Sequence, residues 1–491
     1  MTTRAGAPTG GAPRPPRLSV LALGCAATLA VALLYAPWIA EPHIRYDDVK
    51  FLTSSRTWSE TRVNLWEPMN EHVMPLARLA AGALMRLVQR QSGIPQAAQI
   101  QGVVAVVLGM WLLYAFVRRE LGHPIYGVIA MTLWGVTSTY YECVTWYSAS
   151  FFTLALDTML VGLLAAQSHR RNGRWRSLAV CAVCCALAPA FHGTALLAGA
   201  WCALYLLFPQ QGDGTTPGSW VRRAALASVP LLGSVAFVAI GLTVSAGRIV
   251  RAEHYRGKTI FAAFNPGAGI QNTLRTLADN QIVGAFGFWD RHSTHSWSMV
   301  LAIAGALAVL GVMWWRIAPD RRLLALGLAV TIGSDLLVYS ARADWNYERS
   351  VHNWTRYHLF PHLGLVLFVI GGLRRFEGKW FALAPAAGLS RRQSIALACL
   401  IAGTFIVHRP RAHSSHFPVP PEQRAILQRV ERVDAVCLRA SIDGATARRA
   451  LGFLQFPLGF DGTNAWDFLR GSPSPAPMSV DDARALLGAI Q

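Results

Sequence analysis

The chain has 491 residues, of which 53% are hydrophobic and 14% charged, and its formal net charge is +19. Soluble proteins carry about 25% charged residues, so this composition excludes an ordinary soluble domain. Most of the arginine lies in short segments between apolar runs, and no basic recognition module is present. We therefore attribute the positive charge to membrane topology and anionic headgroups, and we exclude nucleic acid as a partner.

Apolar runs recur along the chain, and about 20 apolar residues suffice for a helix to cross a bilayer. They predict an all-α, polytopic membrane protein with about 11 transmembrane helices. The predicted helices cover residues 18–40, 97–117, 124–140, 147–167, 177–190, 195–208, 224–244, 298–315, 323–340, 358–372 and 393–407. The first run is too long for the core of a signal peptide and lacks an obvious cleavage site, so we expect it to be retained.

The charges between these runs predict the topology. With the N-terminus in the cytoplasm, the arginine-rich loops all fall inside, as the positive-inside rule requires. Residues 1–17 then form a cytoplasmic basic tail and residues 18–407 a transmembrane catalytic domain. Its outer loops cover 41–96, 245–297 and 341–357, and residues 408–491 form a small extracytoplasmic α/β module. We expect a multi-pass protein of a bacterial inner membrane.

Residues 72–90 differ from the membrane-spanning runs. Apolar residues recur there at helical spacing, with Arg78, Arg86 and Arg90 between them. Because three arginines in the bilayer centre would be costly, this pattern predicts an amphipathic helix in the interface, at the rim of the first outer loop.

Ionisable side chains gather on the predicted outer face. The acids are Asp47, Asp48, Glu71 and Glu142, and the other groups are His72, His192, Arg78, Arg356 and Tyr357. Carboxylates can accept a proton from an attacking hydroxyl, and arginine binds phosphate. Such a set suits group transfer from a phosphorylated lipid. Each residue has a structural alternative, since the acids could cap helices, His192 could be a hydrogen-bonded core residue, and Arg356 could reach the headgroups.

Six of the eight cysteines fall inside apolar runs, and Cys181, Cys184 and Cys185 cluster in one of them. The spacing is similar to that of a metal site, but a second pair is not in reach. We expect these thiols to be packed core residues.

Four motifs, in this order, resemble the GT-C superfamily of membrane glycosyltransferases, in particular the protein O-mannosyltransferase-like branch (glycosyltransferase family 39). They are the acidic pair after Tyr46, Pro75-Leu76, Glu142 after the third predicted helix, and the element from Arg356-Tyr357 to Pro361 and Gly364. Where related families carry a Lys-Glu pair, this chain has His192 in the turn 191–194.

The resemblance implies transfer of a sugar from a polyprenyl-phosphate donor to a hydroxyl of a protein, lipid or glycan acceptor, outside the cytoplasm. It assigns Asp47 as general base and Asp48 as the group that orients it, or either as ligand of a divalent cation such as Mg or Mn. Glu142 would support the acceptor or the base, and Arg356 with His192 would bind the lipid phosphate. Glu71, His72, Arg78 and Tyr357 would line the substrate site.

Two other classes fit parts of the pattern. A transporter or flippase for a lipid-linked or anionic solute would explain charged groups in a cavity, but it predicts an internal repeat, and none is evident. A scaffold that kept the fold without activity is the third possibility, and the paired acids disfavour it.

Overall fold

The computed structural model describes residues 20–40, 42, 48, 51–52, 54–55, 57–68, 72–88, 94–208, 218–249, 264–277, 297–318, 321–341, 355–373, 375, 389–414, 457–458 and 463–464. Its elements are α1 (Val20–Leu34), α2 (Ala36–Ala40), α4 (Trp58–Val63), α5 (Pro75–Leu87), α6 (Ile94–Leu121), α7 (Pro124–Gly135), α8 (Glu142–Thr145), α9 (Tyr147–Asn172), α10 (Trp175–Phe191), η2 (Gly193–Leu197), α11 (Ala198–Leu207), α12 (Gly218–Ile249), α14 (Pro266–Thr276), α16 (Trp297–Ile317), α17 (Arg321–Ala341), η6 (Thr355–His358), α18 (Leu359–Leu373), α19 (Arg391–Ser414), β1 (Pro457–Leu458) and β2 (Thr463–Asn464).

Every apolar run of the sequence coincides with a helix, so the predicted helical class is confirmed for the described residues. One small exception is the antiparallel pair β1–β2, in which Pro457 lies opposite Asn464. Six helical segments are long and apolar enough to cross a membrane: Ile94–Leu121, Tyr147–Asn172, Trp220–Val244, Val300–Ile317, Arg321–Ala341 and Thr355–Leu373. Four further apolar helices are shorter, so the expected 11 crossings stay a prediction.

Two predicted helices end differently in the structure. The first predicted helix is broken at Tyr35 into α1 and α2, because Pro37 cannot donate a backbone hydrogen bond. The third stops at Gly135 instead of residue 140, because threonine and serine side chains then compete for the backbone. For example, Thr137 Oγ1 accepts a hydrogen bond from the amide of Thr139. This early stop creates the loop that leads into α8.

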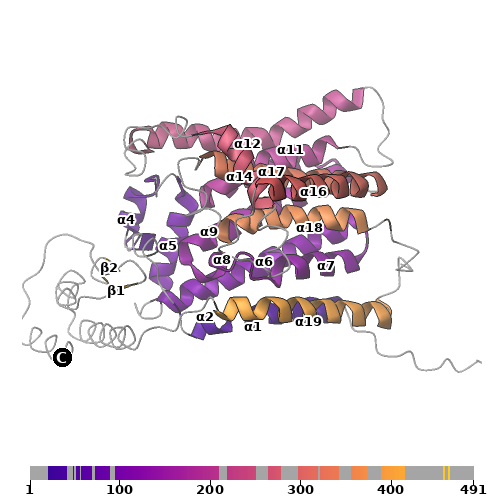
Figure 1. Cartoon of the computed structure of the whole chain (residues 1–491). Helices are drawn as coiled ribbons and strands as arrows, with labels where there is room; N and C mark the ends of the chain where they lie inside the picture. Colours follow the sequence, from indigo (N-terminus) through magenta and orange to yellow (C-terminus); the bar gives the residue numbers. More distant parts are fainter. Residues whose placement is uncertain are drawn as a thin grey trace, which may run out of the picture.

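The long helices lie roughly side by side, and α4, α5 and α8 gather near one end of the bundle (Figure 1). The first and last helices, α1 and α19, are neighbours in this arrangement. Helix α17 packs tightly on α18, since a Cβ placed on Gly327 would lie 2.5 Å from the carbonyl oxygen of Gly364. Glycine at both positions therefore permits this close approach.

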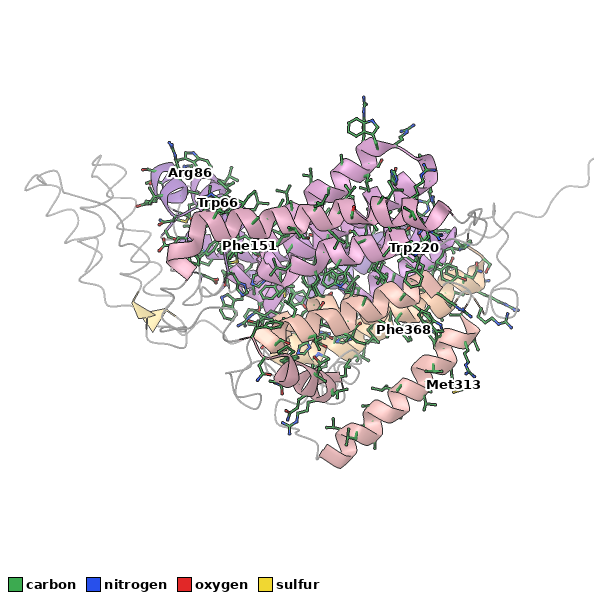
Figure 2. All side chains as sticks on the ribbon, turned by 90° about the horizontal axis from the view of Figure 1, so that it is seen from above. Trp66, Arg86, Phe151, Trp220, Met313 and Phe368 are labelled. Atoms are coloured by element: carbon green, nitrogen blue, oxygen red, sulfur yellow. The ribbon has the colours of Figure 1, made fainter. Side chains whose placement is uncertain are left out.

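Helix α16 stands apart from the rest of the bundle. Figure 2 shows that it diverges from the other helices and that its side chains, Met313 among them, project on their own. Near its C-terminal end, Trp314 Nε1 donates to the carbonyl oxygen of Phe368 at 3.1 Å. Leu301, Val309 and Leu310 are exposed, as expected for a helix that faces lipid.

Helix α19 continues to Ser414, past the predicted boundary at residue 407. The extra turns are anchored, because Trp38 Nε1 donates to the carbonyl oxygen of Ala412 at 3.2 Å and His408 is buried. Residues 408–414 therefore belong to the helical bundle, while most of the expected C-terminal module lies outside the described residues.

Candidate functional site

Asp48 lies at the N-terminus of α9 and is fully buried. Its Oδ1 accepts a hydrogen bond from the amide of Ser148 at 2.7 Å, and its Oδ2 accepts one from the amide of Tyr147 at 3.3 Å. The first amides of a helix have no partner within it, and the helix dipole favours an anion at this end. Asp48 thus caps α9, so its carboxylate is held in a fixed position.

Glu142 and Arg356 form a buried ion pair between α8 and η6. Arg356 Nη1 donates to Glu142 Oε2 at 3.1 Å, and the amide of Arg356 donates to the same oxygen at 3.3 Å. In return, the amide of Glu142 donates to Thr355 Oγ1 at 3.3 Å. The guanidinium also lies over the ring of Trp146, 4.4 Å from its centroid. These contacts join two segments that are far apart in the sequence and fix both ionised groups.

The loop before Glu142 is held from two sides. Tyr35 donates its hydroxyl to the carbonyl oxygen of Thr137 at 2.7 Å, and the amide of Ser138 donates to His408 Nδ1 at 3.2 Å. The hydroxyl of Tyr140 donates to the carbonyl oxygen of Trp134. The break between α1 and α2, together with α19, therefore determines where Glu142 is placed.

The two histidines lie side by side, near enough to Arg356 for its charge to act on both rings. The rings of His72 and His192 have centroids 4.3 Å apart. A Cβ on Gly193 would come within 2.6 Å of His72 Nδ1, so glycine is needed for this approach. His192 stacks on Phe152 at 3.6 Å, and Phe152 meets Tyr357 edge-on at 5.5 Å. This aromatic column connects His72, just before α5, to Tyr357 of η6.

His72 is neutral at pH 7. The side chain as a whole is half-buried, but its Nε2 atom is fully covered. Burial, and then the nearby charge of Arg356, lower the pKa of His72 to about 4. The amide of Thr194 donates to His192 Nδ1 at 3.3 Å, which assigns the proton of a neutral His192 ring to Nε2. Neutral imidazole rings of this kind donate one hydrogen bond each.

Arg78 lies in the first turn of α5 and is buried. Its guanidinium donates to Ser54 Oγ and lies 4.6 Å from the centroid of the Phe51 ring. Phe51 in turn packs against Tyr147, close to the cap made by Asp48. Burial lowers the pKa of Arg78 to about 10, with partial compensation by Glu67, so the group stays charged at pH 7.

The structure therefore brings together the predicted site residues that it describes, namely Asp48, His72, Arg78, Glu142, His192, Arg356 and Tyr357. Asp47 and Glu71 lie outside the described residues. Sequence reasoning missed Phe152 and Thr355. Phe152 is one apolar residue among many in α9, and Thr355 is a small polar residue in a polar loop, so neither carries a distinguishing signal.

The predicted cation ligands gain little support from the described residues. Both oxygens of Asp48 accept hydrogen bonds from backbone amides. In the described part of the chain, the group of side chains close enough to share a metal ion is Cys181, Cys185 and Cys202 instead.

Two comparisons gave no relative, since no protein-family model and no curated protein matches the chain. Among solved structures, the chain is similar to the oligosaccharyltransferase of Archaeoglobus fulgidus tethered to an acceptor peptide, with 12% identity and a TM-score of 0.46. A second structure, the archaeal oligosaccharyltransferase AglB from Archaeoglobus fulgidus with an inhibitory peptide and a dolichol-phosphate, has 12% identity and a TM-score of 0.41. Both alignments cover 96% of this chain and 63% of the other, so the chain spans less than two thirds of their length. TM-scores below 0.5 do not establish a shared fold, and the resemblance to the GT-C superfamily stays a prediction.

Proposed function

We propose that the chain is an integral-membrane glycosyltransferase that transfers a sugar from a polyprenyl-phosphate donor to an acceptor hydroxyl outside the cytoplasm. One observation carries the proposal: carboxylates and cations from four distant parts of the sequence converge at one end of a helical membrane protein. Asp48, Glu142 and Arg356 are all buried there. Burying ionised groups is costly, and perturbed, paired groups of this kind cluster at functional sites.

The acidic pair, Asp47 and Asp48, supplies the general base. The acceptor oxygen attacks the anomeric carbon while Asp47 takes the proton of the hydroxyl. The bond between that carbon and the phosphate oxygen breaks, its electron pair stays on the polyprenyl phosphate, and the configuration of the sugar inverts. Asp48, fixed on the first amides of α9, orients Asp47 from the adjacent position. General-base catalysis contributes roughly 10²–10⁴-fold to the rate.

Arg356, His192 and His72 stabilise the phosphate of the leaving group. Arg356 pairs with Glu142, and its planar guanidinium is the side chain best suited to bind phosphate oxygens with paired hydrogen bonds. His192, with its Nε2 proton, and His72 add hydrogen bonds without adding charge. We assign Tyr357 and Arg78 to the walls of the site. The proposal includes a divalent cation that Asp47 or Asp48 would hold, but no step of the reaction depends on it.

The test is a transfer assay with the purified full-length chain and a panel of polyprenyl-phosphate sugars. We expect one donor to be consumed with release of polyprenyl phosphate, and Asp47→Asn to lower the rate by at least about 100-fold. Glu60→Gln is the matched control, because Glu60 closes the capping box of α4 and glutamine keeps that function. Unchanged transfer by Asp47→Asn would remove the assignment of the base.

A flippase for a lipid-linked solute is the second candidate, and Asp157 favours it. This carboxylate lies within α9, is buried, and neither oxygen has a hydrogen-bond partner among the described residues. Acidic residues inside membrane helices often mark transport pathways. Movement of a lipid-linked sugar across proteoliposomes without any transfer product would favour this function over the first.

A further inference from the structure

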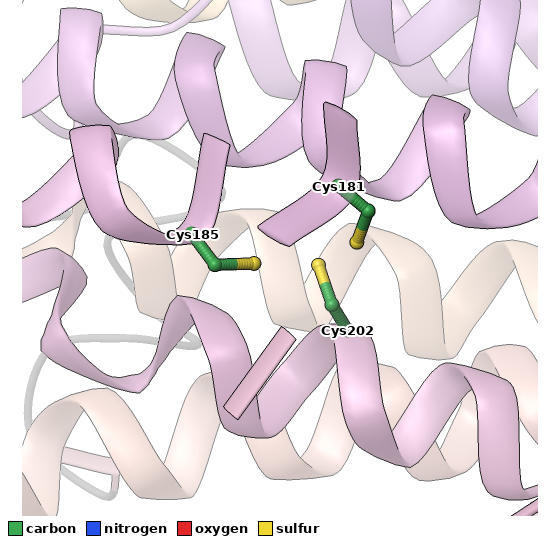
Figure 3. A group of neighbouring side chains, drawn as sticks. All are labelled: Cys181, Cys185 and Cys202. Atoms are coloured by element: carbon green, nitrogen blue, oxygen red, sulfur yellow. The ribbon is translucent and has the colours of Figure 1, made fainter. Parts of the chain in front are cut away.

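Three thiols meet in the middle of the bundle, away from the candidate site. Cys181 and Cys185 lie one turn apart on α10, and Cys202 faces them from α11. Their sulfur atoms lie within 4.8 Å of one another, and all three side chains are fully buried. Figure 3 shows the three sulfur atoms pointing toward one another.

We propose that Cys181, Cys185 and Cys202 form a site for one soft monovalent metal ion, Cu(I). Three sulfurs around a single ion lie about 4 Å apart when each metal–sulfur distance is about 2.3 Å, the value of zinc–thiolate bonds. The observed separations permit this arrangement with small side-chain adjustments.

The number and type of donors select the ion. Structural zinc requires four ligands, whereas the triad offers three. Magnesium and calcium require oxygen ligands, which these side chains do not have. Thiolates are soft donors that select Cu(I).

The apolar surroundings favour a neutral complex. Cu(I) displaces one proton from one thiol, and the other two sulfurs coordinate as thiols, so the ion, one thiolate and two thiols carry no net charge. The copper stays Cu(I), and no sulfur is oxidised. Charge neutrality matters here, because an uncompensated charge inside a membrane protein is costly.

Neighbouring helices support the triad. Gly162 of α9 lies beside it, since a Cβ at this position would be 3.6 Å from Cys202 Sγ. Ser234 of α12 donates to the carbonyl oxygen of Cys185 at 3.2 Å and accepts from the amide of Gly199 at 3.0 Å. These contacts fix α10 and α11 relative to each other, so the donors are positioned before an ion binds.

A bound ion would connect the two arms of the hairpin that carries His192. Cys185 precedes His192 by two helical turns, or about 10 Å along the helix axis. Cys202 lies on the helix that follows the same turn. The ion would therefore stabilise the geometry of the turn without touching the candidate site.

The experiment measures copper uptake, so its outcome does not depend on sugar transfer. The purified full-length chain is titrated without oxygen against Cu(I) held by bathocuproine disulfonate, a coloured chelator. We expect the wild type to withdraw one equivalent, and the X-ray absorption spectrum to show sulfur neighbours only. Cys202→Ser and Cys185→Ser should lose this uptake.

Cys184→Ser is the matched control. Cys184 is buried on the same helix next to Cys185, but it is not part of the triad, and it should leave the uptake intact. Thermal unfolding without copper shows whether each variant folds, and copper should raise the melting temperature of the wild type and of Cys184→Ser only. The proposal is overturned if the wild type takes up no copper, if Cys202→Ser retains the uptake, or if Zn²⁺ binds to the triad in preference to Cu(I).

Discussion

Two buried ion pairs, Glu142–Arg356 and Glu120–Arg322, serve different purposes. Near one end of α6, Gln99 donates to the carbonyl oxygen of Thr145, which belongs to the same short helix, α8, as Glu142. Near the other end, Glu120 pairs with Arg322 of α17. The two positions are about 30 Å apart along the helix axis, which matches the thickness of the hydrocarbon core.

The surroundings of the two carboxylates differ. Glu120 accepts hydrogen bonds from Gln167 at 2.8 Å and from Tyr205 at 2.5 Å, and its partners belong to helices of at least 10 residues. Glu142 and Arg356 instead belong to one-turn helices, beside two histidines. The first pair joins helices in a fixed arrangement. The second places ionised groups on short segments, as functional sites often do.

Arg322→Met should have the largest effect on stability. It leaves the buried carboxylate of Glu120 without its cation, which costs about 3–5 kcal/mol. We expect a strongly lowered melting temperature in detergent, with normal sugar transfer per folded molecule. Arg321→Met, at the exposed neighbouring position, is the control and should change stability by less than about 0.5 kcal/mol. Equal effects of the two variants would show that the pair does not hold the helices together.

The second prediction concerns the stability of the protein at low pH. His72 has a folded-state pKa of about 4 against an ordinary 6.5, so the unfolded chain binds its proton first. The contribution of neutral His72 to the free energy of unfolding is therefore fully present above pH 6.5. It is lost as the pH drops toward 4, by at most about 3 kcal/mol. Burial is the main cause of this lowered pKa and the charge of Arg356 is the second, while the ring of His192 lies beside His72 with its centroid 4.3 Å away.

Melting curves of the wild type and His72→Gln between pH 7 and pH 4 test the assignment. Other groups also titrate in this range, so the quantity to follow is the difference between the two proteins. Wild type should lose more stability than the variant as the pH falls. Parallel curves would mean that His72 is protonated as easily in the folded protein as in the unfolded chain.

Glu142→Gln should affect activity more than stability. The amide still accepts a hydrogen bond from Arg356 but removes its counter-charge, at a cost of about 1–3 kcal/mol. Sugar transfer should fall by about 100-fold or more if Glu142 supports the base. Glu120→Gln removes the corresponding charge at the other end and should leave transfer per folded molecule unchanged. A similar loss in both variants would contradict a special role for Glu142.

The sequence alone names most of the residues that the structure brings together at the candidate site. Ionisable side chains at the ends of apolar runs are few, so the sequence singles out Glu142, His192 and Arg356 one by one. Their pairing was not, because it depends on how α8 packs against η6, two segments with no sequence periodicity in common. The capping of α9 by Asp48 could not be predicted for the same reason, since Asp48 precedes the helix by about 100 residues in the chain.

The cysteines show the same limit. Spacing alone grouped Cys181, Cys184 and Cys185 and predicted packing. In the structure the third member of the group is Cys202, on a different helix, and Cys184 is not part of it. Helical periodicity is consistent with this exchange, because the adjacent residues Cys184 and Cys185 point about 100° apart around the helix, whereas Cys181 and Cys185 share one face.

Asp48→Asn should have the smallest effect on stability and separates capping from catalysis. Asparagine keeps one acceptor for the first amides of α9 but loses the negative charge at the helix N-terminus, which costs about 1 kcal/mol. Hydrogen exchange should become faster at Tyr147 and Ser148, whose amides bind Asp48.

Thr57→Ala is the control for this last variant. It removes the side-chain cap of α4 and costs a similar amount, but it does not touch α9. Exchange at Tyr147 should then stay slow, and transfer should continue. If both variants slow transfer equally, the loss follows from general instability; if only Asp48→Asn does, the cap of α9 is what keeps the acidic pair in position for the acceptor.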